Sequence, residues 1–122
     1  MGAKLVRIVP LALLAIMLFP TLAAAAKPDA PETGRDIILS RKLGNCLACH
    51  SIPGLGKDNV LPGNVGPTLQ NMKSMFSSKK QLRAHIWDET KFNPNTSMPP
   101  FGKHKILTDQ QIDKVVDFLY GL

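Results

Sequence analysis

The chain has 122 residues and a formal net charge of +6, from 15 lysine and arginine residues against 9 acidic ones. A chain of this length supports one small domain, which excludes a two-lobed enzyme, a barrel enzyme and an array of repeats. The two cysteines lie three positions apart, so they cannot provide the disulfide framework that small exported domains often use. Aromatic residues make up only 6% of the chain, so we expect a large apolar cofactor to complete the core.

Residues 1–26 have the three-part layout of a secretory signal peptide. A positively charged start is followed by an uncharged run and by small residues that end at Ala26, so we expect export and cleavage after Ala26. Residues 27–34 are expected to form a flexible tail. The alternative is an uncleaved anchor, because residues 8–26 are marginally long enough to span a bilayer, although Pro20 interrupts the run.

Three segments carry the periodicity or the capping signals of short helices. Over residues 35–43 the apolar residues Ile37, Ile38 and Leu39 lie among polar ones, which fits a short amphipathic helix that Gly44 is expected to end. Ser78 and Thr108 each precede a glutamine by three positions, which is the spacing of a helix-capping box, and apolar residues follow both at helical intervals. No segment has a convincing strand pattern, so we expect an all-α domain of three to five short helices.

Two long segments, residues 51–66 and 92–102, are rich in proline and glycine and are expected to be loops. The first is long for a loop in a small domain, so we expect it to wrap around something. Short helices joined by such loops are consistent with a domain built around a bound group.

The chemistry is carried by a Cys-x-x-Cys-His motif at residues 46–50. On one helical turn, residues three and four apart lie on the same face, so Cys46, Cys49 and His50 can converge on one macrocycle. Thiols add to the vinyl groups of haem to form thioethers, and the iron prefers an imidazole ligand. The motif therefore predicts one haem c, bound through Cys46 and Cys49 and ligated by His50.

Two other kinds of site compete with haem attachment for this motif. A Cys-x-x-Cys pair also occurs in thiol–disulfide exchange sites, but these usually accompany a strand–helix–strand pattern that is absent here. A zinc site would need further ligands, for which only His85 and His104 remain.

A second axial ligand is expected on the opposite face of the iron. Met98 is favoured because the two prolines that follow it stiffen its loop, and because a thioether ligand raises the reduction potential. Met72 and Met75 are expected to fill gaps in the core. His85 is expected to be satisfied or solvent-facing within a helix, and His104, the next candidate after Met98, to lie on a wet surface between two lysines.

A ligating imidazole normally donates its other N–H to a fixed acceptor. The backbone of Pro67 is restrained and its carbonyl is free, so we expect this carbonyl to accept from His50. The alternative is that Gly66 and Pro67 only end the preceding loop.

Together these motifs resemble the class I c-type cytochromes, which combine an early Cys-x-x-Cys-His, a Gly-Pro loop and a late methionine loop before a C-terminal helix. More narrowly, residues 35–122 resemble the SoxX family, the cytochrome subunits of sulfur-oxidising SoxAX complexes. The fullest match is the methionine loop at residues 93–102. The other matching segments are residues 44–50, 62–67, 83–88 and 106–107.

The resemblance implies a cytochrome c domain over residues 35–122, with Cys46 and Cys49 as haem anchors and His50 and Met98 as iron ligands. It also implies a periplasmic heterodimer with a SoxA-type cytochrome. That complex joins thiosulfate oxidatively to a cysteine of the SoxYZ carrier, as an L-cysteine S-thiosulfotransferase, and passes electrons to a downstream cytochrome.

In that reaction this chain is expected only to accept electrons. Both of its cysteines are committed to haem, and an iron with two ligands has no open position for thiosulfate. The alternative is a free-standing periplasmic electron shuttle, steered by its lysines toward an acidic partner. Neither nucleic acid nor a permanent membrane anchor is expected. The lysines that would serve a shuttle are Lys42, Lys57, Lys79, Lys80, Lys103 and Lys105.

Overall fold

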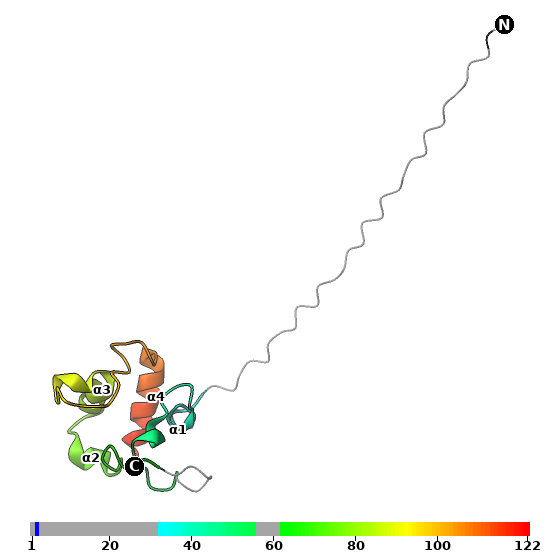
Figure 1. Ribbon diagram of the computed structural model, residues 1–122. Coiled ribbons are helices and arrows are strands. Elements are labelled where there is room, and N and C mark those ends of the chain that lie inside the picture. The colour runs from blue at the N-terminus through cyan, green and yellow to red at the C-terminus, as the bar shows by residue number, and fades with distance from the viewer. Residues whose placement is uncertain (1, 3–31, 56–61) are drawn as a thin grey trace.

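The structure, a computed structural model, describes residue 2 and residues 32–55 and 62–122 (Figure 1). Apart from Gly2, the expected signal peptide lies outside the described residues, as does the expected tail up to residue 31. Within the described part of the chain, no helix has the length and apolar character needed to cross a bilayer.

The regular structure of the described residues consists of four α-helices and two 3₁₀ turns, with no strand. This confirms the predicted all-α fold. The helices are α1 (Gly34–Leu39), α2 (Met72–Met75), α3 (Lys79–Trp87) and α4 (Asp109–Leu119), and the 3₁₀ turns are Cys46–Ala48 and Glu89–Lys91.

The first helix is shorter than the sequence predicted. It begins at Gly34 because the hydroxyl of Thr33 accepts from the N–H of Asp36, whose carboxylate accepts from the N–H of Thr33 in return. It ends at Leu39 and not at residue 43, because Ser40 is extended and the chain turns back before Gly44. The expected end at Gly44 was therefore wrong.

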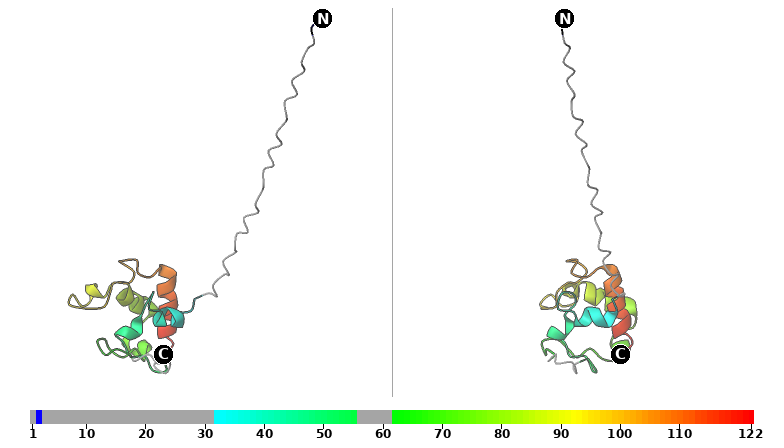
Figure 2. Two further views of the ribbon diagram at one scale, coloured as in Figure 1. Left: turned by 45° about the vertical axis from the view of Figure 1, so that its right-hand side comes forward. Right: turned by 90° about the vertical axis from the view of Figure 1, so that its right-hand side faces the viewer.

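Helix α1 crosses α4 in close contact, as both views of Figure 2 show. A Cβ on Gly34 would lie 2.1 Å from the carbonyl oxygen of Lys114, so only glycine allows this approach. The crossing is extended by Glu32, whose carbonyl accepts from Lys114 and whose carboxylate accepts from Gln111. Residues 32–34, which the sequence assigned to the flexible tail, thus contact α4, cap α1 and begin α1 in turn.

The later helices begin where the capping signals predicted. Thr108 and Gln111 form the predicted capping box at α4. At α3 the hydroxyl of Ser78 accepts from the N–H of Gln81, but the side chain of Gln81 accepts from Ser77 and not from Ser78. The reciprocal half of that box therefore lies one residue upstream of its expected place.

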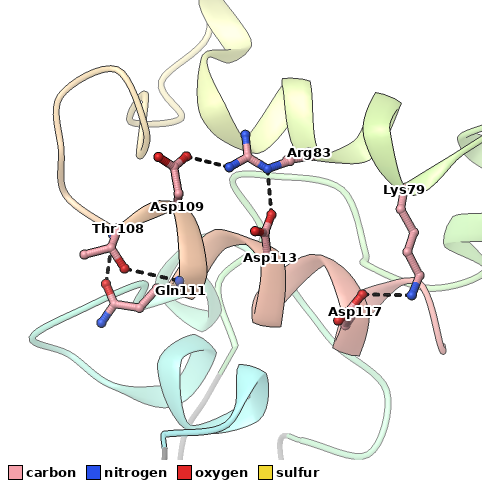
Figure 3. Close-up of polar contacts among 7 residues, drawn as sticks. All are labelled: Lys79, Arg83, Thr108, Asp109, Gln111, Asp113 and Asp117. Carbon is pink, nitrogen blue, oxygen red and sulfur yellow. Dashed lines mark hydrogen bonds and ion pairs between the residues drawn. The ribbon is translucent and has the colours of Figure 1, made fainter.

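A ladder of ion pairs joins α3 to α4 (Figure 3). Lys79 lies 2.8 Å from Asp117, and Arg83 reaches both Asp113 at 2.7 Å and Asp109 at 2.6 Å. From Lys79 to Arg83 the residue number increases along α3, whereas the residue numbers of their partners decrease along α4. The two helices therefore run antiparallel. Except for Arg83, these side chains are more than half exposed, and such ion pairs contribute little stability individually. Their main effect is to fix the register in which α3 and α4 pack.

Candidate haem-binding site

A cavity of about 830 Å³ lies between the helices and the long loops, and its wall is mainly apolar. This volume is within the range of roughly 300–1,000 Å³ for sites that hold a small molecule or cofactor. The wall contains all the residues that the sequence assigned to haem, namely Cys46, Cys49, His50, Pro67 and Met98.

The Cys-x-x-Cys-His motif forms a tight turn on this wall. The carbonyl of Cys46 accepts from the N–H of Cys49 at 3.2 Å and from that of His50 at 2.9 Å. The two cysteines are half-buried and are not joined by a disulfide. The turn is a short 3₁₀ segment and not a full α-helical turn, yet it places both sulfurs and the imidazole on one cavity wall, as the spacing predicted.

The cysteines differ from those of a thiol–disulfide exchange site. Burial raises the pKa of the Cys46 thiol to about 11, whereas the first cysteine of an exchange site has a lowered pKa that keeps it reactive. The described residues also provide no ligands for a zinc site, because they contain no group of three His, Cys, Asp or Glu side chains that could hold a metal ion.

The loop before Pro67 fixes the imidazole of His50. Nδ1 of His50 lies 2.8 Å from the carbonyl oxygen of Pro67, so the predicted contact is present. A carbonyl can only accept, so Nδ1 carries the hydrogen and Nε2 of the neutral ring keeps its lone pair for a metal. The same loop is tied to the motif by two 2.8 Å backbone bonds, from Gly63 to Leu47 and from Gly66 to Cys49.

Gly66 is a site residue that the sequence analysis treated only as part of a loop. A Cβ there would lie 2.4 Å from Cε1 and 2.6 Å from Nδ1 of His50. The Gly66→Ala variant is therefore expected to displace the imidazole and to lose most of its correctly ligated haem. The absorption spectrum of the purified variant measures this. An unchanged spectrum would show that the loop moves aside without disturbing His50.

The methionines have different positions around the cavity. Met98 lines the wall and is half-buried, and its N–H donates to the hydroxyl of Thr96 at 3.0 Å. Met72 is only 1% exposed and belongs to the core, as expected. Met75 is 54% exposed at the cavity rim, so its expected place in the core was wrong.

Only one of the two remaining histidines lines the cavity. His104 is exposed and does not line the cavity, as its lysine neighbours suggested. His85 lines the cavity, but its Nδ1 is 2.8 Å from a carboxylate oxygen of Glu89 and its ring stacks on Phe92 at 3.8 Å. His85 is therefore a helix residue whose imidazole already has a hydrogen-bond partner. The spacing of four residues from His85 to Glu89 was the available sequence signal for this pair.

These residues fit a covalently bound haem. Two free thiols lie beside an imidazole with an accessible nitrogen, a thioether lines the same cavity, and the wall between them is apolar. Cys46 and Cys49 would form the thioether links, and His50 would be an axial ligand of the iron.

Comparison with known proteins gives the same assignment. The cytochrome c family matches residues 31–122. A chain in the crystal structure of SoxXA from P. pantotrophus superimposes with a TM-score of 0.62 and 30% identity, over 75% of this chain and 82% of that one.

Two curated relatives are longer proteins. An uncharacterized lipoprotein of Aquifex aeolicus (strain VF5) is 31% identical over 80 residues, which is 65% of this chain and 37% of the relative. The Cbb3-type cytochrome c oxidase subunit CcoP of Azospirillum sp. (strain B510) is 29% identical over 117 residues, which is 84% of this chain and 38% of the relative. The chain thus spans less than two fifths of each.

The family match covers most of the chain and includes every cavity residue named above. A cytochrome c domain implies a covalently bound haem c, and the single Cys-x-x-Cys-His motif provides for one. The chain therefore belongs to the cytochrome c family, as a monohaem class I member of the SoxX type.

Proposed function

We propose that this chain is the electron-accepting subunit of a periplasmic SoxAX-type complex that oxidises thiosulfate. The observation that carries the proposal is the likeness to SoxXA, at 30% identity over most of both chains. The match between the methionine loop and the SoxX pattern also supports it. In this proposal residues 1–26 direct export and are removed.

In the proposed holoprotein, Cys46 and Cys49 would anchor the haem, and His50 and Met98 would ligate its iron. The bound haem supplies an iron that takes up and gives away one electron at a time. The chain holds the imidazole of His50 through Pro67 and keeps water from the macrocycle with its apolar wall. A thioether on the second side raises the potential, which suits an electron acceptor.

This arrangement leaves thiosulfate to the partner. Joining a thiosulfate sulfur to a carrier cysteine breaks the S–H bond of the thiol, forms one sulfur–sulfur bond, and releases one proton and two electrons. The cysteines of this chain are both bonded to haem, and an iron with two axial ligands has no open position. The SoxA-type subunit would therefore bind thiosulfate and the SoxYZ carrier, and this chain would pass the electrons on to a downstream cytochrome.

Exposed apolar residues of the cavity wall offer surface that a permanent partner would cover. Val65, Met75 and Ile106 line the cavity and are 68%, 54% and 41% exposed, and we call them the rim. Large exposed apolar side chains are typical of interaction surfaces. We therefore place the SoxA-type partner over this rim.

A charge on the rim should break the complex. Ile106→Lys is expected to weaken binding of the purified SoxA-type subunit by about tenfold or more, because a lysine must be desolvated in an apolar contact. Leu122→Lys is the matched control, because Leu122 is 39% exposed but does not line the cavity. Binding measured by calorimetry distinguishes them. Equal affinities for both variants would remove the rim from the interface.

The function itself is tested by gentle purification of the chain from its native periplasm. We expect a second cytochrome to co-purify, a haem stain on both chains, and haem reduction that depends on thiosulfate and the carrier. Recovery of a lone monomer, with thiosulfate oxidation intact in a strain that lacks the chain, would defeat the proposal.

The second candidate function is a free-standing electron shuttle. The likeness to a cytochrome oxidase subunit favours it. Of its proposed steering lysines, Lys79 and Lys103 form ion pairs with Asp117 and Asp88, and Lys57 lies outside the described residues. The same purification separates the two functions, because a shuttle is recovered alone and exchanges electrons with an oxidase without any requirement for thiosulfate.

A further inference from the structure

A buried carboxylate lies at the base of the segment that carries Met98. Asp88 has none of its surface exposed and is the only buried polar or charged residue in the described part of the chain. It follows the last residue of α3, where its N–H donates to the carbonyl of Ala84 at 3.1 Å. Burial of a carboxylate is unfavourable unless its oxygens are partnered, so its partners indicate why it is retained.

The partners of Asp88 come from the two ends of that segment. Oδ1 accepts from the hydroxyl of Thr90 and from its N–H, the latter at 3.2 Å. Oδ2 has no partner among the described residues except Nζ of Lys103, at 3.1 Å. The Thr90 hydroxyl and then the Lys103 ammonium hold the pKa of Asp88 below its usual range. The carboxylate is thus charged, and it contacts Thr90 at one end of the segment and Lys103 at the other.

The backbone also joins the two ends at this point. The carbonyl of Trp87 accepts from the N–H groups of Gly102 and Lys103, at 3.2 and 3.3 Å. A Cβ on Gly102 would lie 2.0 Å from Cε3 of Trp87, so the backbone rests directly against the indole. Residues 89–102 therefore form a closed loop whose base consists of these contacts and the ion pair.

Between its ends, the loop forms hydrogen bonds to itself and apolar contacts with the core. Asn93 donates to Glu89, Thr96 donates to Asn93, and the N–H of Met98 donates to the hydroxyl of Thr96. Phe101 is buried in the core and Met98 packs against this core. Glu89 and Phe92 contact His85. The base joins the two ends of the loop and so helps to set the place of Met98.

We propose that Asp88 and Lys103 form a clasp that positions Met98 against the haem iron, so that both are positioning residues for the axial ligand. The inference rests on the proposed function, in which Met98 binds the iron. Loss of Lys103 leaves one oxygen of a buried carboxylate without a partner, which destabilises the closed loop. The open loop then forms more often, and the sulfur of Met98 leaves the iron more often.

The test is imidazole binding to the oxidised holoprotein. Imidazole reaches the iron only when Met98 has left, so its apparent affinity reports the fraction of open loop. For Lys103→Gln we expect about tenfold tighter imidazole binding, a moderate factor because Lys103 is 54% exposed. Faster amide exchange at Gly102 is expected with it. Lys105→Gln is the matched control, since Lys105 is exposed nearby and has no ion pair among the described residues, and it should behave as wild type.

A second variant tests the partner. Asp88→Asn keeps the size of the side chain and removes its charge, so it should match Lys103→Gln, and the double variant should bind imidazole no tighter than either single one. Wild-type imidazole affinity and amide exchange in Lys103→Gln would overturn the clasp. If Met98→Ala also binds imidazole as weakly as wild type, the ligand assignment itself fails. If Met98→Ala binds it tightly, only the clasp fails.

Discussion

Replacement of both Cys46 and Cys49 by alanine should yield a chain with the mass of the bare polypeptide and no fixed tertiary structure. Without thioethers the haem is not held covalently, and the mainly apolar wall of the cavity of about 830 Å³ would face water. Apolar surface left in contact with water forfeits about 25 cal/mol per Å². A domain that is stable by only roughly 5–15 kcal/mol depends on such burial, so the chain should collapse into a less ordered state.

Mass spectrometry, near-ultraviolet circular dichroism and denaturant unfolding check this expectation. Cys49→Ala alone is the control, because one thioether remains and the haem should stay attached. A double variant that unfolds cooperatively, with the dichroism of the wild type, would show that the core of this domain does not depend on haem.

The helices show what local sequence signals can and cannot predict. The capping residues Ser78 and Thr108 gave the starts of α3 and α4 correctly, because a cap is formed within a few residues. The predicted end of α1 was wrong because the helix stops at Leu39, where Ser40 is extended. The N–H of Gly44 then donates to the carbonyl of Ile37, a turn that the periodicity of residues 35–43 did not show.

The site was predicted as far as spacing determines it. The Cys-x-x-Cys-His motif defines its own geometry, and the restrained carbonyl of Pro67 gave the partner of His50. Met72 and Met75 were not distinguished, because they are one turn apart on a helix of four residues and only packing decides which is buried. Asp88 was also missed, since its partner Lys103 lies across a loop whose closure the sequence does not show.

The largest change in redox behaviour is expected for Met98→Ala. Axial ligands tune haem potentials over about 0.8 V, and a thioether favours the reduced iron. Loss of the thioether should therefore lower the reduction potential by on the order of tenths of a volt. The weak long-wavelength absorption band that a sulfur ligand gives to oxidised haem should disappear at the same time. Potentiometric titration and the spectrum of the oxidised protein measure both effects.

Met75→Ala is a strict control for this experiment, because Met75 lines the same cavity and carries the same chemical group. It is 54% exposed on the rim, so its loss should leave both the potential and the sulfur band unchanged. The reverse pattern, with Met75→Ala altered and Met98→Ala normal, would move the ligand to α2. A change in neither variant would leave the second axial position to Met72 or His85, which also line the cavity.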